Sequence, residues 1–588
     1  MDTTVVIPAL YMLTGRNASG TDASLWYLLD WGQIRRSVKS LQVRTAKAVK
    51  QKQWRKMCSL QWMLTHSLAA KLLAVKRVTE NAGKRTPGTD GQLWRKGPEK
   101  LQGALTLKLK GYEPKPVRRI YIPKSNGKKR PLGIPTIRDR AMQALHLQAL
   151  DPVSETLADA NSYGFRPYRS CTDAIARCFS ILAKQQNAPE WILEGDIKGC
   201  FDNISHVWML ANIPMHQLTL CKWLEAGFVE QKRWFPSPGG TPQGSVISPT
   251  LANMVLDGME AHLDNALGIK HIGTKVDRRI NPDHVHLIRY ADDFIVTASS
   301  VEILHRAKAC IREFLAERGL ELSEEKTSIT HIDAGFDFLG QHIKRFKGKL
   351  VIQPARKNVH TFLQNIRRTI KRLTSAPALE VIDRLTPMIR GWALYHRHIS
   401  AAETFQFVDH EIQGRLWRWA KRRHSHRKNA LWIKNRYFRH NGKANWVFFA
   451  KDEDGNTIDL FRAASIRIER HVKIQADANP YDPEYELYFE RRQSEIMYTK
   501  LAGRKLLKYL YTRQAGKCAL CGQPITPATG WDKHHLIPKY VGGPHTDENL
   551  VLLHPDCHVQ VHHENLHIPA PPRRPSGNRA GVRSAGAG

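Results

Sequence analysis

Acidic residues are scarce in this sequence of 588 residues. The 54 Asp and Glu residues face 90 Lys and Arg residues, which gives a formal net charge of +36 and a pI near 9.9. Such an imbalance attracts polyanions through counterion release and makes nucleic acid the natural partner. A generically basic protein is the alternative, but the positive charge spreads over nearly the whole chain and is interleaved with Trp and Tyr.

Long apolar runs are also absent. No stretch approaches the length of a membrane span, and the apolar segment within 1–13 lacks the basic flank that precedes a secretory signal. We therefore expect no membrane partner and a soluble, intracellular chain.

Cysteine is the third scarce residue type, with nine copies in the chain. Six of them are scattered and are interpreted as ordinary reduced thiols: Cys58, Cys171, Cys178, Cys200, Cys221 and Cys310. The other three cluster close to the C-terminus. That clustering indicates metal binding rather than disulfide bonding.

The length of the chain exceeds what one hydrophobic core can organise, so we expect several domains. Residues 1–30 are weakly patterned and suggest a poorly ordered leader, whereas 34–81 has helical periodicity. Short β-like runs mix with helical ones between about 112 and 345, which favours an α+β domain. The expected divisions are 1–83, 84–345, 346–440, 441–505, 506–566 and 567–588, the last a disordered tail.

Two adjacent carboxylates, Asp292 and Asp293, lie between the apolar runs HLIR and FIVTAS. Carboxylates at a tight turn between strands suit a divalent metal, whereas a pair buried in a core would be costly. Most such turns are simply solvated hairpins. Asp196, at the end of the strand WILEGDI, could join the pair to hold two Mg²⁺, one activating a 3′-hydroxyl and one steadying the leaving pyrophosphate. Alone, Asp196 could equally cap a helix.

A series of motifs runs through residues 80–440. They are RRIYIPKSNGKKRPLGIPTIRDRAMQ (118–143), NSYGFRPYRSCTDAI (161–175), EGDIKGCFDNISH (194–206), GGTPQGSVISPTLANMVLD (239–257), RYADDFIV (289–296), LELSEEKT (320–327) and FDFLG (336–340). In content and order they resemble the reverse transcriptases of bacterial group II introns. The resemblance implies a right-hand polymerase with fingers and palm over 84–345 and an α-helical thumb, or maturase domain, over 346–440. Asp196, Asp292 and Asp293 would be its metal carboxylates.

The resemblance also assigns a nucleotide site. Lys124 and Arg130 lie in the block that covers the incoming triphosphate, a task that suits basic side chains. Gln243 would lie beneath the nucleotide. Phe201 matches the aromatic position that blocks a 2′-hydroxyl and so favours dNTPs, although it could instead be a core aromatic residue. A viral RNA-dependent RNA polymerase would normally show Gly-Asp-Asp and lack this aromatic residue.

Basic and aromatic residues alternate in RLWRWAKRRHSHRK (415–428). Stacking on Trp417 and Trp419, with phosphate contacts from the neighbouring cations, is the expected chemistry of RNA binding. A solvated basic helix face is the alternative. In the family this surface grips intron RNA and helps it to splice. The predicted RNA-binding residues are Arg415, Trp417, Arg418, Lys421, Arg422 and Arg423.

Two pairs of residues near the C-terminus have the spacing of a tetrahedral structural Zn²⁺ site: Cys518 with Cys521, and His554 with Cys557. The usual pattern has Cys at the position of His554, so His554 is either the fourth ligand, which we favour, or a bystander. His534-His535, Asn549 and His558-x-x-x-His562 follow in an order that resembles the HNH nucleases with a ββα-metal core. A purely structural zinc knuckle is the alternative.

A strand would present His534 and His535 on opposite faces, while His558 and His562 fall on one face of a helix. The resemblance makes His534, His558 and His562 the ligands of a second divalent metal, expected to be Mg²⁺. His535 would be the general base and Asn549 would fix the base loop. The metal would hold the scissile phosphate and stabilise the leaving 3′-oxygen.

The presence of both sites and the resemblance to the intron family together imply a protein that copies RNA into DNA, helps its intron RNA to splice and stays on the excised lariat as a ribonucleoprotein. The HNH site would nick the target DNA, with further contacts from 441–505, and the polymerase would extend the new 3′-hydroxyl with dNTPs during intron homing. We expect the protein in the bacterial cytoplasm, at the nucleoid when it engages target DNA. One alternative is a splicing-only maturase with vestigial catalytic sites. Another is a reverse transcriptase with a different role, such as host defence or diversity generation.

Overall fold

The computed structural model describes most of the chain. The described residues are 25–123, 129–184, 188–269, 271–272, 275–276, 281–424, 429–442, 444–501, 504–527, 529–538, 541, 543–544, 546–564 and 566–569. They form two compact units: the first contains the described residues within 25–36, 96–101 and 490–569, and the second those within 37–95 and 102–489. Among the helices described, none is long and apolar enough to cross a membrane.

Helices begin the second unit. They are α3 (Trp31–Lys50), which starts in the first unit and continues into the second, α4 (Trp54–His66), α5 (Leu68–Glu80) and the 3-10 turn η1 (Ala82–Arg85). α4 and α5 pack against α7 (Ile137–Leu157), which is buried along most of its length. Thr136 starts α7, because its Oγ1 accepts a hydrogen bond from the N–H of Asp139. The helical periodicity expected for 34–81 is confirmed.

A four-stranded sheet follows, in the order β2-β1-β4-β5. Its strands are β1 (Val117–Pro123), β2 (Lys129–Ile134), β4 (Phe228–Glu230) and β5 (Arg233–Phe235). β1 and β2 are antiparallel, with Ile122 opposite Arg130, and β1 runs parallel to β4. The N–H of Gly133 on β2 donates to the carbonyl oxygen of Gln243. That hydrogen bond joins the Pro-Gln-Gly turn to this sheet.

The central sheet is antiparallel throughout, in the order β10-β3-β9-β8. Its strands are β3 (Trp191–Asp196), β8 (His286–Tyr290), β9 (Asp293–Ala298) and β10 (Ser328–His331). α8 (Cys171–Leu182) packs on β8, and α14 (Val301–Ala316) packs on β3 and β9. Five of the six residues of β9 are buried, as expected for the apolar run FIVTA in an interior strand. The predicted mixture of helices and antiparallel strands is confirmed.

Shorter elements complete the region around the two sheets. They are α6 (Gly97–Leu105), which also crosses between the units, α9 (Cys200–Asn203), α10 (His206–Asn212), α11 (Gln217–Glu225), α12 (Ser248–Leu256), α13 (Met259–Ala266), η2 (Glu324–Lys326), β6 (His271–Ile272) and β7 (Lys275–Val276).

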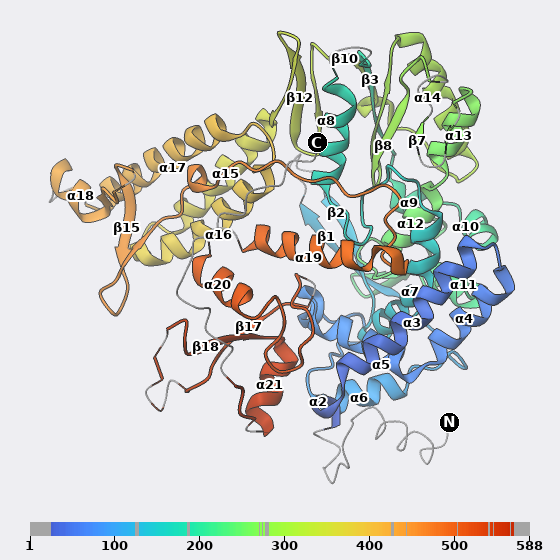
Figure 1. Ribbon diagram of the computed structural model, residues 1–588, viewed down its shortest axis with the longest axis horizontal. Coiled ribbons are helices and arrows are strands. Elements are labelled where there is room, and N and C mark those ends of the chain that lie inside the picture. Colours follow the sequence, from blue (N-terminus) through green and yellow to red (C-terminus); the bar gives the residue numbers. More distant parts are fainter. Residues whose placement is uncertain are drawn as a thin grey trace. The chain divides into compact units, whose positions relative to one another are not determined.

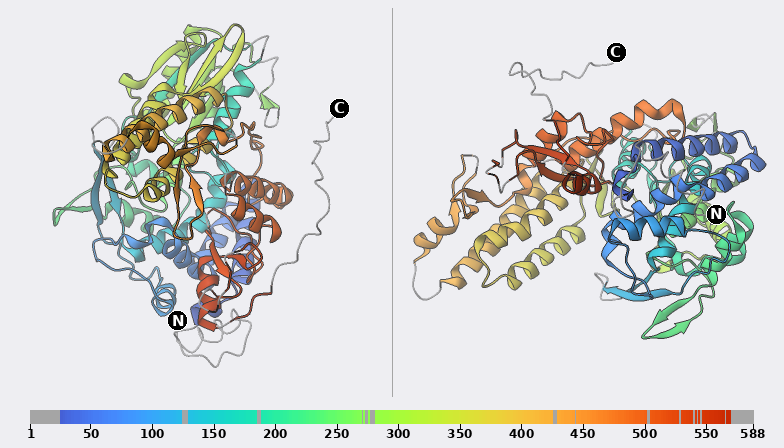
Figure 2. Two further views of the ribbon diagram at one scale, coloured as in Figure 1. Left: turned by 90° about the vertical axis from the view of Figure 1, so that its left-hand side faces the viewer. Right: turned by 90° about the horizontal axis from the view of Figure 1, so that it is seen from below.

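The thumb is a helical bundle that follows a three-stranded sheet. The sheet contains β11 (Phe336–Phe338), β12 (Gln341–Phe346) and β13 (Lys349–Pro354), and the bundle contains α15 (Arg356–Arg372), α16 (Ala378–His396), α17 (Ala402–Arg423) and α18 (Ala430–Tyr437). α15, α16 and α17 lie side by side in the views of Figures 1 and 2, and α15 packs on both of the others.

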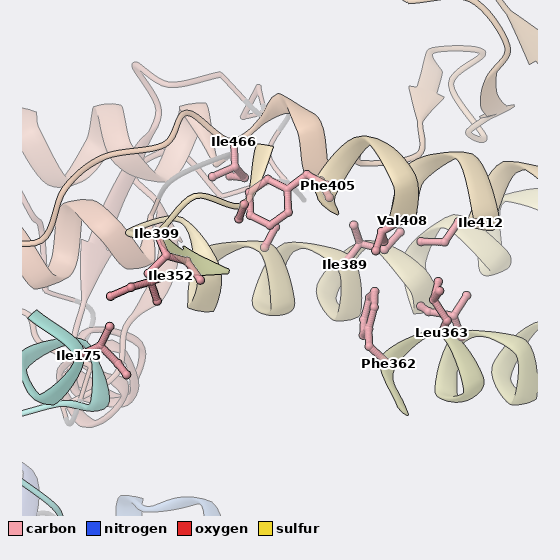
Figure 3. Close-up of a cluster of buried hydrophobic side chains, with 14 of the residues drawn as sticks. Ile175, Ile352, Phe362, Leu363, Ile389, Ile399, Phe405, Val408, Ile412 and Ile466 are labelled. Atoms are coloured by element: carbon pink, nitrogen blue, oxygen red, sulfur yellow. The ribbon is translucent and has the colours of Figure 1, made fainter. Parts of the chain in front are cut away.

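Apolar residues at three- and four-residue steps hold this bundle together. Figure 3 shows Phe362 and Leu363 of α15 facing Ile389 of α16 and Val408 of α17. All four side chains are buried. Burial of such side chains contributes roughly 1.5–3 kcal/mol each, which makes the bundle a stable part of the second unit.

Residues 466–489, which we call the return segment, lead the chain from the thumb back to the palm. Before it lie β14 (Phe438–Arg439), β15 (Val447–Lys451), β16 (Thr457–Asp459) and η3 (Ala463–Ser465), and it contains η4 (Pro483–Tyr485). The buried carboxylate of Asp173 accepts hydrogen bonds from the N–H of Ile474 and from His471. Arg169 donates to the carbonyl oxygens of Ala476 and Ala478. The return segment is therefore packed onto the palm.

The first unit combines a small β-hairpin module with two segments from the N-terminal region. Its elements are α2 (Leu25–Leu28), the start of α3, residues 97–101 of α6, the end of α19 (Glu486–Lys500), α20 (Lys505–Arg513), β17 (Asp532–His535), β18 (Leu550–Leu553) and α21 (Pro555–Glu564). All four residues of β18 are buried in its core. Trp26 is 0% exposed, so the expected disordered leader is wrong for residues 25–30. The rest of the proposed leader, 1–24, and the tail, 570–588, lie outside the described residues.

Candidate active sites

Three carboxylates converge at one end of the central sheet. Asp196, the last residue of β3, lies directly opposite Asp293, the first residue of β9. Tyr290 of β8 also pairs with Asp293, which leaves Ala291 and Asp292 as a two-residue turn. Ala291 has φ +58°, as hairpin turns of this length require. The antiparallel register thus brings together the three residues that the sequence identified.

The electrostatics of this cluster favour a bound cation. Burial raises the pKa of Asp292, with a further contribution from Asp196, although Arg130 and Lys326 oppose it. Burial, together with the charges of Asp292 and Asp196, raises the pKa of Asp293 to about 7. Carboxylates this close resist ionising together unless positive charge is supplied. The donor set therefore fits a divalent metal, whose preferred ligands are oxygen atoms.

Lys326 contributes a positive charge that the sequence interpretation missed. Its Nζ lies 2.6 Å from Oδ2 of Asp196, and that hydrogen bond raises the pKa of Lys326. Lys326 ends η2, directly before β10, which pairs with β3. The block LELSEEKT contained this residue, but only the strand pairing shows that it reaches Asp196.

Two groups hold the turn that carries Asp292. The guanidinium of Arg289 is 1% exposed; it donates to the carboxylate of Asp257 and, at 3.5 Å, to the carbonyl oxygen of Ala291. Gly164 lies against the turn, and a Cβ at this position would be 2.3 Å from the backbone nitrogen of Ala291. Only glycine allows so close an approach. Neither residue was singled out from the sequence.

The predicted nucleotide residues surround the carboxylates to different degrees. Arg130 is an exposed residue of β2 whose charge acts on Asp292. Gln243 is held through its carbonyl oxygen by β2. Phe201 is half-buried on α9, and its ring meets that of Phe165 edge-on with centroids 6.3 Å apart. Lys124 lies outside the described residues.

The predicted RNA-binding residues of α17 divide into two groups. Arg418, Lys421 and Arg422 are exposed. Arg415 pairs with Glu411, and Arg423 donates to the carbonyl oxygens of Thr374 and Ala376.

The two tryptophans of α17 also differ from each other. Trp417 is partly buried and packs edge-on against Trp446. Trp419 departs from the stacking expectation: its ring is 3% exposed and its Nε1–H donates to the carbonyl oxygen of Leu373. Trp419 therefore belongs to the thumb core.

Four potential metal ligands cluster in the first unit. The ligand atoms of Cys518, Cys521, His554 and Cys557 all lie within 4.8 Å of one another. Nε2 of His554 is 3.1 Å from the carbonyl oxygen of Pro524, so this nitrogen carries the proton and donates. Nδ1 faces the sulfur of Cys521 at 3.3 Å, on the side of the cluster. His554 therefore lies among the three sulfurs, as a fourth ligand would.

The charges inside this cluster also suit a cation. Hydrogen bonds from Cys521 and Cys557 lower the pKa of the Cys518 thiol. Burial lowers the pKa of His554, but the sulfurs of Cys518 and Cys521 outweigh burial and raise it to about 9. Thiolate and imidazole donors in a tetrahedral set fit Zn²⁺.

A second cluster of potential metal ligands contains three histidines. The ligand nitrogens of His534 on β17 and of His558 and His562 on α21 also lie within 4.8 Å of one another. Burial, followed by the neighbouring His558 and His562, lowers the pKa of His534 to about 4, which keeps it neutral and able to bind a metal. Asp532, which the sequence interpretation did not use, lies 3.4 Å from Nδ1 of His558. A carboxylate behind a histidine ligand fixes its orientation.

The remaining two predicted nuclease residues lie at the end of β17. His535 follows His534, so its side chain leaves the opposite face of the strand. Asn549 is buried; its Nδ2 donates to the carbonyl oxygens of Ile537 and Pro544, and its Oδ1 accepts from the N–H of Ile537. Asn549 thus pins the loop that directly follows His535.

Comparisons with known families match these regions in turn. The matching family models are an N-terminal domain of reverse transcriptase (26–107), a reverse transcriptase, or RNA-dependent DNA polymerase (122–343), a group II intron maturase-specific domain (359–438) and an HNH endonuclease (518–564). Protein YkfC of Escherichia coli K12 is 32% identical over 315 residues, which cover 47% of this chain and 81% of that protein. The chain belongs to the group II intron-encoded reverse transcriptases.

Two further proteins, one curated relative and one solved structure, are similar to parts of the chain. The group II intron-encoded protein LtrA of Lactococcus lactis subsp. cremoris is 33% identical over 301 residues, 41% of this chain and 48% of that protein. The matched part thus spans about half of the Lactococcus protein. Among solved structures, apo telomerase from Candida tropicalis matches with a TM-score of 0.33 and 15% identity, over 54% of this chain and 57% of that chain. The family and the polymerase and HNH fold classes expected from the sequence are confirmed.

Proposed function

We propose that this protein is an RNA-directed DNA polymerase, an intron RNA maturase and a DNA endonuclease that act together in intron homing. One observation carries the proposal: a single chain holds both the carboxylate cluster of Asp196, Asp292 and Asp293 and the histidine cluster of His534, His558 and His562. The family matches over 122–343, 359–438 and 518–564 support it.

At the polymerase site, the three aspartates would hold Mg²⁺, which supplies activation of the primer 3′-hydroxyl and charge stabilisation of the leaving pyrophosphate. Lys124 and Arg130 would bind the triphosphate of an incoming dNTP. Gln243 would support the nucleotide, and the ring of Phe201 would exclude a 2′-hydroxyl. The exposed cations of α17 would contact intron RNA through its phosphates.

At the nuclease site, His534, His558 and His562 would hold a divalent metal, for which we propose Mg²⁺, and its role is to stabilise the leaving 3′-oxygen. His535 would take a proton from water, with its loop held by Asn549. Cys518, Cys521, His554 and Cys557 would hold a structural Zn²⁺. The nick made in target DNA supplies the 3′-hydroxyl for the polymerase.

The proposed division of the chain follows the same logic. Residues 84–345 would form the fingers and palm, 346–440 the thumb and 506–566 the nuclease module. Residues 441–505 would contribute to target-DNA binding. The complete set of carboxylates and histidines supports this multifunctional role over a splicing-only maturase.

Primer extension on poly(rA) with oligo(dT), dTTP and Mg²⁺ tests the polymerase. We expect incorporation by the wild-type protein and none by Asp292→Ala, while Asp333→Ala, an exposed carboxylate beyond β10, retains it. Incorporation that survives in Asp292→Ala would refute the site.

Nicking is tested with the intron RNA and a supercoiled plasmid that carries the ligated flanking exons. His535→Ala should remove nicking and preserve primer extension, whereas the exposed His567→Ala should change neither. Equal nicking by His535→Ala and the wild type would refute His535 as the base.

A further inference from the structure

Two short segments that belong by sequence to the N-terminal reverse-transcriptase domain pack with the HNH module. Residues 26–107 match the N-terminal domain model, yet residues 25–36 and 96–101 form one compact unit with the described residues within 490–569. α2 packs directly against α21 (Figure 1), the helix that carries His558 and His562.

A buried ion pair lies at this contact. Nζ of Lys100 is 3.6 Å from Oδ1 of Asp556, and the two side chains are 8% and 11% exposed. The same ammonium lies 5.5 Å from the ring centroid of Trp26, which is fully buried. Lysine is rarely buried unless it is paired. The burial of Lys100 beside a carboxylate and an aromatic ring therefore indicates a specific structural contact.

Asp556 occupies the first turn of α21, where a carboxylate also interacts favourably with the helix dipole. Two residues later the same helix presents His558, and one turn further on it presents His562. A contact that holds Asp556 in place, such as the ion pair with Lys100, therefore also holds the start of the helix that supplies two of the three histidines.

The N-terminal segment reaches the zinc-binding part of the module as well. A Cβ at Gly32, in the first turn of α3, would be 3.1 Å from Nε2 of Gln523. Gln523 follows the Cys518–Cys521 pair by two residues, and its carbonyl oxygen accepts from the N–H of Cys518. The edge-on pair of Trp26 and Trp31, with ring centroids 4.9 Å apart, lies in the same short segment.

We propose that residues 25–36 and 96–101 are a structural part of the nuclease, and that Lys100 is a positioning residue for α21. Loss of the Lys100–Asp556 pair would displace His558 and His562 and weaken metal binding at the nuclease site. This consequence rests on the proposed endonuclease function. The nuclease then depends on segments that lie more than 450 residues before α21 in sequence.

Hydrogen–deuterium exchange of the full-length protein tests the contact between Lys100 and Asp556 and does not require nuclease activity. Exchange of amides in 555–564 should rise by about tenfold or more in Lys100→Glu and in Asp556→Lys. The double variant Lys100→Glu/Asp556→Lys, in which the two charges are swapped, should restore protection of these amides. Lys100→Arg should retain it. Lys96→Glu, an exposed cation in the same segment, is the matched control. The proposal is overturned if both single variants show the same hydrogen exchange as the wild type, or if the charge-swapped double variant does not recover protection.

Nicking of a supercoiled plasmid with the intron RNA then tests the functional consequence. Lys100→Met, which removes the charge without introducing repulsion, should lower nicking by about tenfold and shift the half-maximal Mg²⁺ concentration upward, with primer extension unchanged. A general structural defect would lower nicking without a shift in Mg²⁺ dependence, and that result would reject Lys100 as a positioning residue. If the wild-type protein does not nick, the proposed function fails, while the exchange experiment still decides the contact.

Discussion

Nζ of Lys326 lies 2.6 Å from Oδ2 of Asp196, so the carboxylate cluster carries a cation of its own before any metal binds. Lys326 is largely exposed, with a side-chain exposure of 65%, and its attraction to Asp196 is correspondingly screened. An ammonium in this position would compete with a divalent metal for the same carboxylate oxygen.

Replacement of Lys326 should therefore tighten metal binding at the polymerase site. For Lys326→Met we expect the dissociation constant for Mn²⁺, measured by electron paramagnetic resonance, to fall by about two- to fivefold, the range of a partly exposed ion pair. Lys308→Met, which removes a lysine paired with Glu324, serves as the control. Weaker Mn²⁺ binding by Lys326→Met would show that the two cations do not compete.

A methyl group at residue 164 should disable the polymerase. Gly164→Ala would place a Cβ 2.3 Å from the backbone nitrogen of Ala291, so the turn that carries Asp292 must shift, at a cost of about 1–3 kcal/mol in stability. We expect primer extension to fall by at least about tenfold. Gly414→Ala, on α17 with no heavy atom within 4 Å of its Cβ, should retain activity. Full activity of Gly164→Ala would mean that the turn tolerates displacement.

A smaller residue at position 201 should relax the choice of sugar. Phe201→Val removes a half-buried ring that meets Phe165 edge-on, and the space released would accept a 2′-hydroxyl. The ratio of kcat/KM for rNTP over dNTP should rise by about tenfold or more. Phe346→Val, at an exposed ring on β12, is the control. An unchanged ratio of rNTP to dNTP use would show that Phe201 only packs in the core and does not select the sugar.

Zinc content should follow the identity of residue 554. His554→Ala removes one of four donors and should leave the purified protein with much less than one zinc per chain, whereas His554→Cys should retain it, because thiolate and imidazole are both good ligands. Elemental analysis measures the outcome, with the exposed His567→Ala as the control. Stoichiometric zinc in His554→Ala would show that His554 is a bystander.

Acid should destabilise the thumb through a buried histidine. His396 is 0% exposed, and burial, with a contribution from His398, lowers its pKa from 6.5 to about 3. The unfolded chain then binds more protons than the folded one below pH 6.5, so stability is fully present above that pH and is lost as the pH falls toward 3. Each pKa unit corresponds to about 1.4 kcal/mol.

Thermal unfolding followed between pH 7 and pH 4 checks this expectation. The Tm should fall on acidification, and His396→Gln, which keeps an N–H donor for Asn358, should flatten the decline. An identical slope in the variant would assign the acid sensitivity to other groups.

The catalytic carboxylates could be predicted because their convergence follows from local rules. A two-residue turn between apolar strands places Asp292 and Asp293 at one sheet end, and Asp196 ends a third strand of the same kind. Lys326 and Arg289 could not be placed in this way, because their roles depend on which strands pair and on which carboxylates are buried nearby. The return segment was also missed, because Asp173 and Arg169 hold it through backbone groups that no side-chain pattern reveals.

The two tryptophans of α17 show a signal that was present in the sequence but not used. Leu416, Trp419 and Ala420 follow Val408 and Ile412 at three- and four-residue steps, and all five are buried. Trp417 lies off that stripe. Helical periodicity alone separates the core tryptophan from its neighbour. The burial of Trp26 and Lys100 had no such signal, because it depends on residues near the opposite end of the chain.

The return segment has a mechanical consequence for the thumb. The chain connects the palm to the beginning of the bundle through β13 and α15, and at the end of the bundle residues 466–489 are fastened to Asp173 and Arg169. Buried residues of the palm, such as Ile175, and of the bundle, such as Phe362, also belong to one hydrophobic core. We therefore expect the thumb to keep its position against the palm and to resist independent rotation.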